Sequence, residues 1–288
     1  MKTRYIPAAC AAALLLTGCF HDFHEAQPGM GYIATALLWE QSEDAQTDIE
    51  HLDVAVLGAS ASFSKEYASA QEAAADLLAV PEGEYDLLVA ANMTTDKGYT
   101  LEGWPATKAG TVQGSVAAVL SGKEDFSQAW FGLTHVSVQK GSVTGAQPAL
   151  QRLLSPLTLD ISHLPEGSTI KIMQAGAAKR VSLTEQDAAG RFGVPAAKSS
   201  SYQFLSGSVT YLLPTASNLE RSQLIIMITT GTGLELGCIC DAPRVDVGKH
   251  YTLQLDFNEL QPILLLDSVS ISPWEDSWVI SGDILDPR

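Results

Sequence analysis

The residue types that serve in enzyme active sites are present in this chain, but their spacing matches no catalytic motif. No Gly-x-Ser-x-Gly sequence marks a serine nucleophile on a strand-to-helix turn. Glu275 and Asp276 are neighbouring carboxylates. Because adjacent residues of a strand point to opposite faces, these two do not form an acid/base pair. The glycines of residues 231–237 have the wrong spacing for a nucleotide-binding loop and fit a hairpin turn better. The sequence therefore predicts a protein that is not an enzyme and that needs no cofactor.

One cysteine stands where its thiol would be modified. Lys2 and Arg4 give a positively charged start, and an apolar run follows over residues 6–16. That run is shorter than the roughly 20 residues that span a bilayer, but it is typical of a signal peptide. It ends in Leu-Thr-Gly-Cys19, which is similar to a bacterial lipobox. We therefore predict a signal peptide over residues 1–18 and lipidation of Cys19, with ordinary secretion and an unmodified Cys19 as the alternative.

Two further groups of residues have side chains that bind metals. His21, His24 and Glu25 lie directly after the predicted lipid, where a solvated tether explains them better. Cys238 and Cys240 alternate with apolar residues, so both thiols would lie on one face of a strand, about 6.6 Å apart along it. That distance is near the upper limit for a disulfide, and no other Cys or His stands at ligand spacing. We expect no metal site and two buried thiols, with a disulfide as the alternative.

The charge of the chain limits its partners. Loss of residues 1–18 leaves 15 of the 17 basic residues against 33 acidic ones, a net charge of −18. Nucleic acid and anionic lipid surfaces would repel such a chain, so neither is an expected partner. No later segment is apolar enough to cross a membrane, so attachment would depend on acyl chains on Cys19. Because Phe20 rather than Asp follows Cys19, analogy with other lipoproteins favours the outer membrane.

Period-two patterns predict an all-β protein. Tyr251, Leu253, Leu255 and Phe257 alternate with polar residues, which places them on the buried face of a strand. Similar patterns recur along the chain between turns rich in Gly, Pro, Ser and Asn. Residues 68–79 favour a short helix, and residues 124–130 a turn or two of helix. We therefore predict antiparallel β-sandwiches rather than a doubly wound α/β fold. The length of the chain suits two domains, over residues 19–146 and 147–288.

Several motifs, taken in order, resemble the fimbrillin-type lipoproteins of Bacteroidales, which are subunits and anchors of type V pili. The similarity extends over most of residues 19–257 and depends on short motifs, which are the lipobox Cys19, the strand ending at Trp39, the turn and strand of residues 77–92, Phe131-Gly132, residues 150–153 and the Gly-Lys-His-Tyr-Thr-Leu sequence of residues 248–253. The resemblance implies two transthyretin-like sandwiches in tandem. It also implies assembly with other fimbrial subunits by β-strand exchange, in which a strand from one subunit completes the sheet of the next.

The distribution of basic residues indicates a role within that family. The resemblance implies that stalk subunits are cleaved after a basic residue near the N-terminus, which removes the lipid and the first strand. No Lys or Arg lies between Cys19 and Ser64. This favours an anchor or minor subunit on the cell surface that keeps both its lipid and its first strand.

The C-terminal segment is unusually apolar for a chain end. We expect residues 263–271 to form a closing strand of the second sandwich. We expect the end of the chain to be donated to a neighbouring subunit, through a candidate donor strand that contains Trp278, Val279, Ile280, Ile284 and Leu285.

The alternative function is a surface lipoprotein that binds glycans or nutrients by stacking sugars on exposed tryptophans. The five candidates are Trp39, Trp104, Trp130, Trp274 and Trp278. Most tryptophans in proteins are core or interface residues, which favours the fimbrial interpretation.

Overall fold

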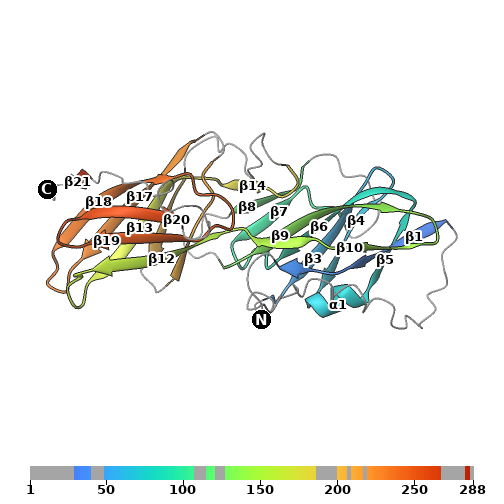
Figure 1. Cartoon of the computed structure of the whole chain (residues 1–288), viewed down its shortest axis with the longest axis horizontal. Helices are drawn as coiled ribbons and strands as arrows, with labels where there is room; N and C mark the ends of the chain where they lie inside the picture. Colours follow the sequence, from blue (N-terminus) through green and yellow to red (C-terminus); the bar gives the residue numbers. More distant parts are fainter. Residues whose placement is uncertain are drawn as a thin grey trace, which may run out of the picture.

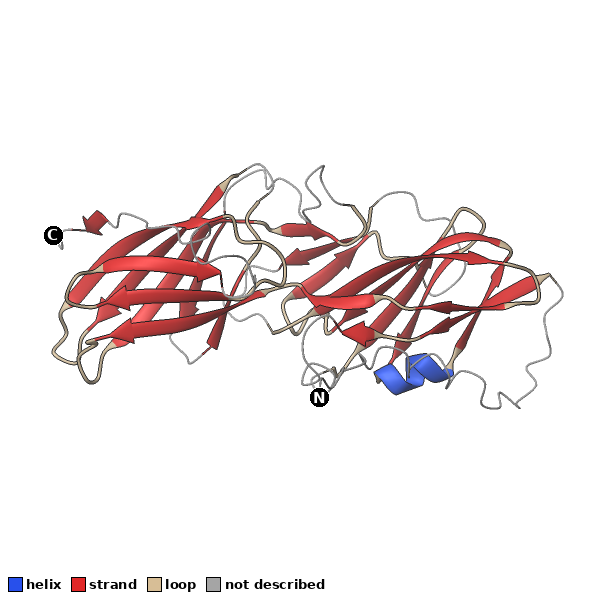
Figure 2. Ribbon diagram, in the orientation of Figure 1, coloured by secondary structure: helices blue, strands red, loops and turns tan. Residues whose placement is uncertain are grey.

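The protein is built almost wholly of β-strands. The structure is a computed structural model that describes residues 29–39, 49–106, 115–120, 127–185, 200–205, 209–216, 219–266 and 283–285. The molecule is elongated, and most strands run along its long axis, with one short helix among the described elements (Figures 1 and 2). The all-β sandwich prediction is confirmed.

The N-terminal part of the chain forms two sheets. A three-stranded sheet has the order β10-β1-β5 and a six-stranded sheet has the order β2-β11-β9-β6-β3-β4. The bounds of these strands are β1 Met30–Thr35, β2 Leu38–Trp39, β3 Leu52–Leu57, β4 Ser62–Tyr67, β5 Leu77–Pro81, β6 Gly83–Ala91, β9 Trp130–Val138, β10 Val143–Ala146 and β11 Ala149–Arg152.

The C-terminal part also forms two sheets, at the other end of the molecule (Figure 1). Their strand orders are β16-β12-β19-β20 and β15-β13-β17-β18-β21. The strands are β12 Ser155–Ser162, β13 Thr169–Ala177, β15 Ser200–Leu205, β16 Val209–Leu212, β17 Arg221–Thr229, β18 Glu235–Pro243, β19 Tyr251–Asp256, β20 Gln261–Leu266 and β21 Asp283–Leu285. Residues 263–266 of the expected closing strand belong to β20, which pairs with β19, and residues 267–271 lie outside the described residues.

A small fifth sheet contains strands from both parts of the chain. It has the order β14-β8-β7, with β7 at Tyr99–Glu102, β8 at Ala117–Leu120 and β14 at Arg180–Ser182. The Arg180 guanidinium lies 3.0 Å from the carboxylate of Glu102, and the Leu183 amide donates to the Val116 carbonyl at 2.9 Å. One hydrophobic cluster likewise extends from β6 to β19. The division into residues 19–146 and 147–288 stays a prediction.

The period-two pattern correctly identified core positions over residues 251–255, whereas Phe257, predicted on the same face, is partly buried against the core. Tyr251, Leu253 and Leu255 are each at most 2% exposed, whereas the intervening residues of β19 are partly exposed. On β18, Cys238 and Cys240 are buried thiols that are not joined in a disulfide, as expected. Burial raises the pKa of the Cys238 thiol to about 11 because it disfavours the thiolate.

Not every strand pair is antiparallel, in contrast to the prediction. β1 pairs in parallel with β10, β2 with β11, and β12 with β19. Each of these pairs joins strands that are far apart in the sequence. The chain between the two partners passes back through other strands, so the partners run in the same direction. Local sequence patterns do not predict this direction.

The helix is shorter than the composition of residues 68–79 suggested. Helix α1 spans Ala70–Ala75, and its cap is reciprocal: Ser69 Oγ accepts the Glu72 amide at 3.2 Å, and Glu72 accepts the Ala68 amide at 2.9 Å. The following residues form β5 because they pair with β1. Tertiary pairing therefore overrides the helical preference of this segment.

Candidate strand-exchange site

The first strand of the described chain is paired along both of its edges. β1 lies between β5 and β10 and pairs antiparallel with β5 over five residue pairs and in parallel with β10 over four (Figure 1). Additional bonds fix its ends, because the Gly141 amide donates to the Met30 carbonyl and the Ala36 amide to the Ala146 carbonyl, both at 2.9 Å. β1 is therefore a central strand of its sheet.

The side chains of β1 alternate between the core and the surface. Ile33 is fully buried and Thr35 is 4% exposed. At Gly31, β1 lies very close to the end of β9. A β-carbon there would overlap the side chain of Val138, the last residue of β9, and the carbonyl oxygen of Gln139, which follows it. Glycine is therefore required at this position by the close approach of two backbones.

The segment that follows β1 enters the second sheet of the N-terminal part. The Leu38 amide donates to the Pro148 carbonyl at 3.1 Å, and β2 then pairs with β11 at two positions. One short stretch of chain, residues 30–39, thus contributes a strand to each of the two N-terminal sheets. Its loss would affect both sheets together.

The contacts of β1 show what its removal would expose. The facing edges of β5 and β10 would lose their hydrogen-bond partners, and unpaired backbone groups in a buried position are costly. Leu78 and Val80, which are at most 4% exposed, would lose Ile33 from their cluster. An extended strand from another chain has the geometry to satisfy such a groove.

The sequence around β1 offers no cleavage site for a protease specific for basic residues. The first Lys or Arg after Cys19 is Lys65, which lies within β4 and pairs with β3.

The Lys65 ammonium and the Tyr67 hydroxyl both bond to Asp76 Oδ2 at 2.6 Å. Burial alone would raise the pKa of Asp76, but these bonds outweigh it and hold that pKa below its usual value.

The residues predicted for the site have different outcomes. Cys19, Trp278, Val279 and Ile280 lie outside the described residues. The other two donor-strand candidates are in β21, where Ile284 pairs with Cys238 and Leu285 with Gly237. β21 pairs with three of the nine residues of β18 and lies at the end of its sheet. The sequence pattern missed the partners of β1, because pairing with β5 and β10 leaves no local signal.

The alternative predictions can be compared with the same structure. Trp130 is 3% exposed, and Trp104 is partly buried against the core, so these two do not form an exposed platform for sugars. Among the described residues, no three His, Cys, Asp or Glu side chains are grouped to hold a metal ion. None of the described helical residues forms a helix long and apolar enough to cross a membrane.

The architecture is similar to that of several solved structures. A candidate adhesin of Bacteroides thetaiotaomicron is 9% identical, with a TM-score of 0.52 over 84% of this chain and 97% of that one. A fimbrial assembly protein of Parabacteroides distasonis is 11% identical, with a TM-score of 0.51 over 88% and 98%. The chain shares the fold of these two proteins. A further similar structure, described as a candidate polysaccharide-binding protein of B. thetaiotaomicron, is 9% identical, with a TM-score of 0.50 over 84% and 99%.

Neither a protein-family model nor a curated protein sequence matches the chain. At identities this low, the similarity establishes a shared fold, and function has to be argued from the residues of this chain.

Proposed function

We propose that this chain is a cell-surface lipoprotein, held in the outer membrane by acyl chains on Cys19, that acts as an anchor or minor subunit of a fimbrium. The observation that carries the proposal is the position of β1. The strand is bonded along both edges, and the chain has no Lys or Arg between Cys19 and Ser64 at which a protease could release it. The subunit would keep its lipid and its first strand, and its role would be structural rather than catalytic.

The other fimbrial subunits are the proposed partners. The similar structures include a fimbrial assembly protein and a candidate adhesin, which supports a role in adhesion at the cell surface. Because β1 already fills its own groove, this subunit would join a fimbrium by donating a strand. Residues 278–285 would serve as the donor, since their described part pairs along one edge only and over three positions. The subunit would consist of two sandwiches, residues 19–146 and 147–288. The donated strand would link this subunit to the next one.

The donor hypothesis is tested by removing residues 274–288 from the protein in its native cells. We expect a folded, lipidated protein that no longer retains fimbriae on the cell. Circular dichroism and incorporation of radiolabelled palmitate would verify folding and lipidation. Fimbriae retained normally by the shortened protein would refute donation, and global unfolding would show that the segment closes its own sandwich.

Lipid attachment is tested separately with Cys19→Ala. This protein should take up no radiolabelled palmitate and should not partition into the membrane. Palmitate incorporation by Cys19→Ala would show that the lipobox interpretation is wrong.

A glycan-binding lipoprotein is the second candidate, favoured by the similar structure that is described as a candidate polysaccharide-binding protein. Purification of the full-length protein from its native membrane separates the two functions. Co-purified pilin subunits would support fimbrial assembly, and a bound oligosaccharide would support glycan binding.

A further inference from the structure

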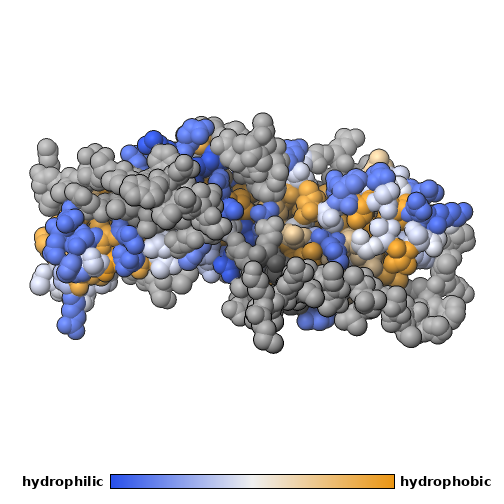
Figure 3. All heavy atoms as spheres, in the orientation of Figure 1, coloured by the Kyte–Doolittle hydropathy of each residue, from blue (hydrophilic) through white to orange (hydrophobic). Residues whose placement is uncertain are grey.

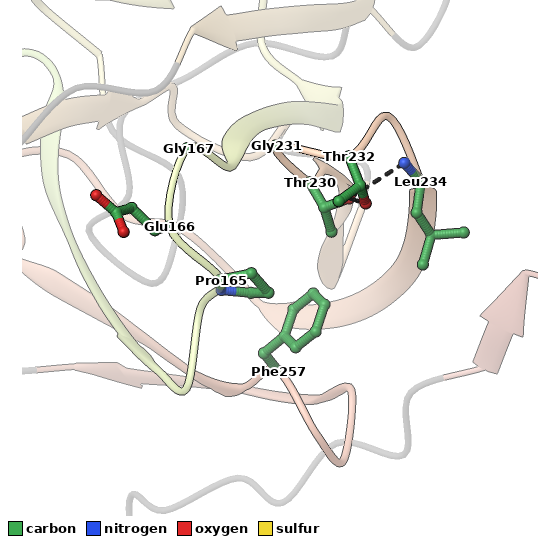
Figure 4. Close-up of a pocket in the computed structure, with 8 residues that line it drawn as sticks. All are labelled: Pro165, Glu166, Gly167, Thr230, Gly231, Thr232, Leu234 and Phe257. Carbon is green, nitrogen blue, oxygen red and sulfur yellow. Dashed lines mark hydrogen bonds between the residues drawn. The ribbon is translucent and has the colours of Figure 1, made fainter.

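A pocket lies at the end of the molecule farthest from the N-terminal sheets. Three connections meet there: residues 163–168 between β12 and β13, residues 230–234 between β17 and β18, and residues 257–260 between β19 and β20. They enclose about 640 Å³ (Figure 4). This pocket is separate from β1 and from the predicted lipid, so the proposed fimbrial function does not account for it.

The interior of the pocket is mainly apolar. Pro165 and Phe257 lie beside each other on one side, and Leu234, which is 52% exposed, lies on the other (Figure 4). The hydroxyl of Thr230 is engaged within its own loop, because it lies 2.9 Å from Thr232 Oγ1 and accepts the Leu234 amide at 3.1 Å. Few free polar groups therefore remain inside the pocket for a polar ligand.

The loops that meet at the pocket are acidic, and Glu166 is the carboxylate among the residues that line it. Residues 163–168, 229–236 and 256–260 contain four carboxylates and no Lys or Arg, and the carboxylates belong to Glu166, Glu235, Asp256 and Glu259. His163 is the one residue in these loops that can carry a positive charge, when protonated, opposite the carboxylates. Its Nδ1 lies 3.0 Å from Asp256 Oδ2. Figure 4 shows the Glu166 carboxylate directed away from the interior. In the space-filling view, hydrophilic residues dominate this end, with small hydrophobic areas between them (Figure 3).

The loops around the pocket hold a defined conformation. A β-carbon at Gly231 would lie 2.7 Å from the Glu166 carbonyl oxygen, so the first two loops are in close contact. His163 and Leu260 have φ angles of 57° and 51°, which are unfavourable for residues with side chains. Such strain persists only where the surrounding structure fixes it, and it is common at binding sites.

We propose that this pocket binds an extended polypeptide segment of a partner protein through one bulky apolar side chain flanked by Lys or Arg. The apolar side chain would enter between Phe257 and Leu234, which removes apolar surface from water. The flanking cations would interact with Glu166, which lines the pocket, and with Glu235, which follows the lining residue Leu234. Charge complementarity of this kind also speeds association and rejects acidic segments.

The binding test uses the full-length protein and fluorescein-labelled peptides. The probe is an eight-residue peptide, about the length of one strand, with a central Phe between lysines; matched peptides carry Ala in place of Phe or Glu in place of Lys. Fluorescence anisotropy should show saturable binding of the Lys-Phe peptide. We expect each matched peptide to bind at least about tenfold more weakly, or about 1.4 kcal/mol.

Two exposed apolar residues, Leu234 in the connection between β17 and β18 and Met227 in β17, provide matched variants. Leu234→Ser removes an exposed wall of the pocket and should weaken binding about tenfold. Met227→Ser alters a residue of β17 that is 40% exposed and does not line the pocket, so binding should not change. Circular dichroism would verify that both variants are folded. The double change Glu166→Gln and Glu235→Gln should weaken binding of the Lys-Phe peptide and reduce its dependence on salt.

Three outcomes would overturn the proposal. The first is the absence of saturable binding by the Lys-Phe peptide. The second is binding that Leu234→Ser and Met227→Ser affect equally. The third is binding of a neutral oligosaccharide, with maltoheptaose as the probe, that Leu234→Ser abolishes, since this would assign the pocket to glycans. Peptide binding is measured on the purified full-length protein and fimbrial retention is measured on cells, so the pocket and the proposed function can fail independently.

Discussion

The first and last described strands of this protein differ in how they are held. β1 has a neighbouring strand along each edge, inserts Ile33 into the core, and requires Gly31 at a close approach. β21 pairs along one edge only, with three residues of β18, at the end of its sheet. A strand that is exchanged loses the interactions that it makes within its own subunit. Releasing β1 from its sheet would therefore cost far more free energy than releasing β21. The difference supports the proposed function, in which the subunit keeps β1 and donates a segment that includes β21.

The largest effect is expected where β1 enters the core. Ile33→Ala should lower the free energy of unfolding by about 2–5 kcal/mol, because it leaves a cavity at a fully buried position. Val143→Ala changes a residue of β10 that is 60% exposed and should alter stability by at most about 0.5 kcal/mol. Urea denaturation measures both. Equal losses from the two changes would mean that β1 is not a central strand.

A smaller loss is expected at the close approach of β1 to its neighbour. Gly31→Ala should cost about 1–3 kcal/mol, because the added methyl group overlaps the Gln139 carbonyl and the strand must shift. Gly145→Ala on the adjacent β10 is the matched control, since a β-carbon there would have no neighbour within 4 Å. Thermal unfolding of both variants separates steric overlap from the general effect of replacing a glycine. A fully stable Gly31→Ala protein would contradict the described packing of β1.

Loss of the last strand should have a still smaller effect. Removal of residues 274–288 deletes the three pairs of β21, and each hydrogen bond contributes about 1 kcal/mol net. We therefore expect the unfolding free energy to fall by about 1–2 kcal/mol. Urea denaturation would measure this change against Ile33→Ala. A loss as large as that of Ile33→Ala would remove the contrast between the two strands.

The smallest effect concerns surface charge, and it depends on pH. On the exposed face of β6 and β9, His135 lies 2.8 Å from Asp86 and 3.0 Å from Glu84, and these hydrogen bonds raise the pKa of His135 above 6.5. Protonated His135 stabilises the fold, so its contribution is fully present below pH 6.5 and is lost as pH rises through the raised pKa. The Tm difference between the wild-type protein and His135→Gln should therefore shrink with increasing pH. The cost of Ile33→Ala should be the same at each pH, because no charge is involved.

Much of the β-structure was evident from local alternation. Tyr251, Leu253 and Leu255 were assigned to the core because a strand turns successive side chains to opposite faces, and the burial of Cys238 and Cys240 followed from the same period. The fold shared with the similar adhesin and fimbrial assembly structures was anticipated from the order of several short motifs. The parallel pairs and the extent of α1 were not predicted, because they depend on residues far away in the sequence. β5 is a strand rather than a continuation of the helix because β1 lies beside it.

The sequence by itself determined which segments alternate and where basic residues are absent. Both properties are local, since alternation reflects the two faces of a strand and a protease recognises a few adjacent residues. Only the tertiary structure decided that β1 is enclosed between β5 and β10. It also decided that three distant, acidic loops form a pocket with an apolar interior around Phe257. Hydrogen-bond partners and pocket walls are contributed by residues up to about a hundred positions apart. These distant residues come together because the sheets pack with one face of each strand buried. Which strands pack against one another does not depend on their closeness in the sequence.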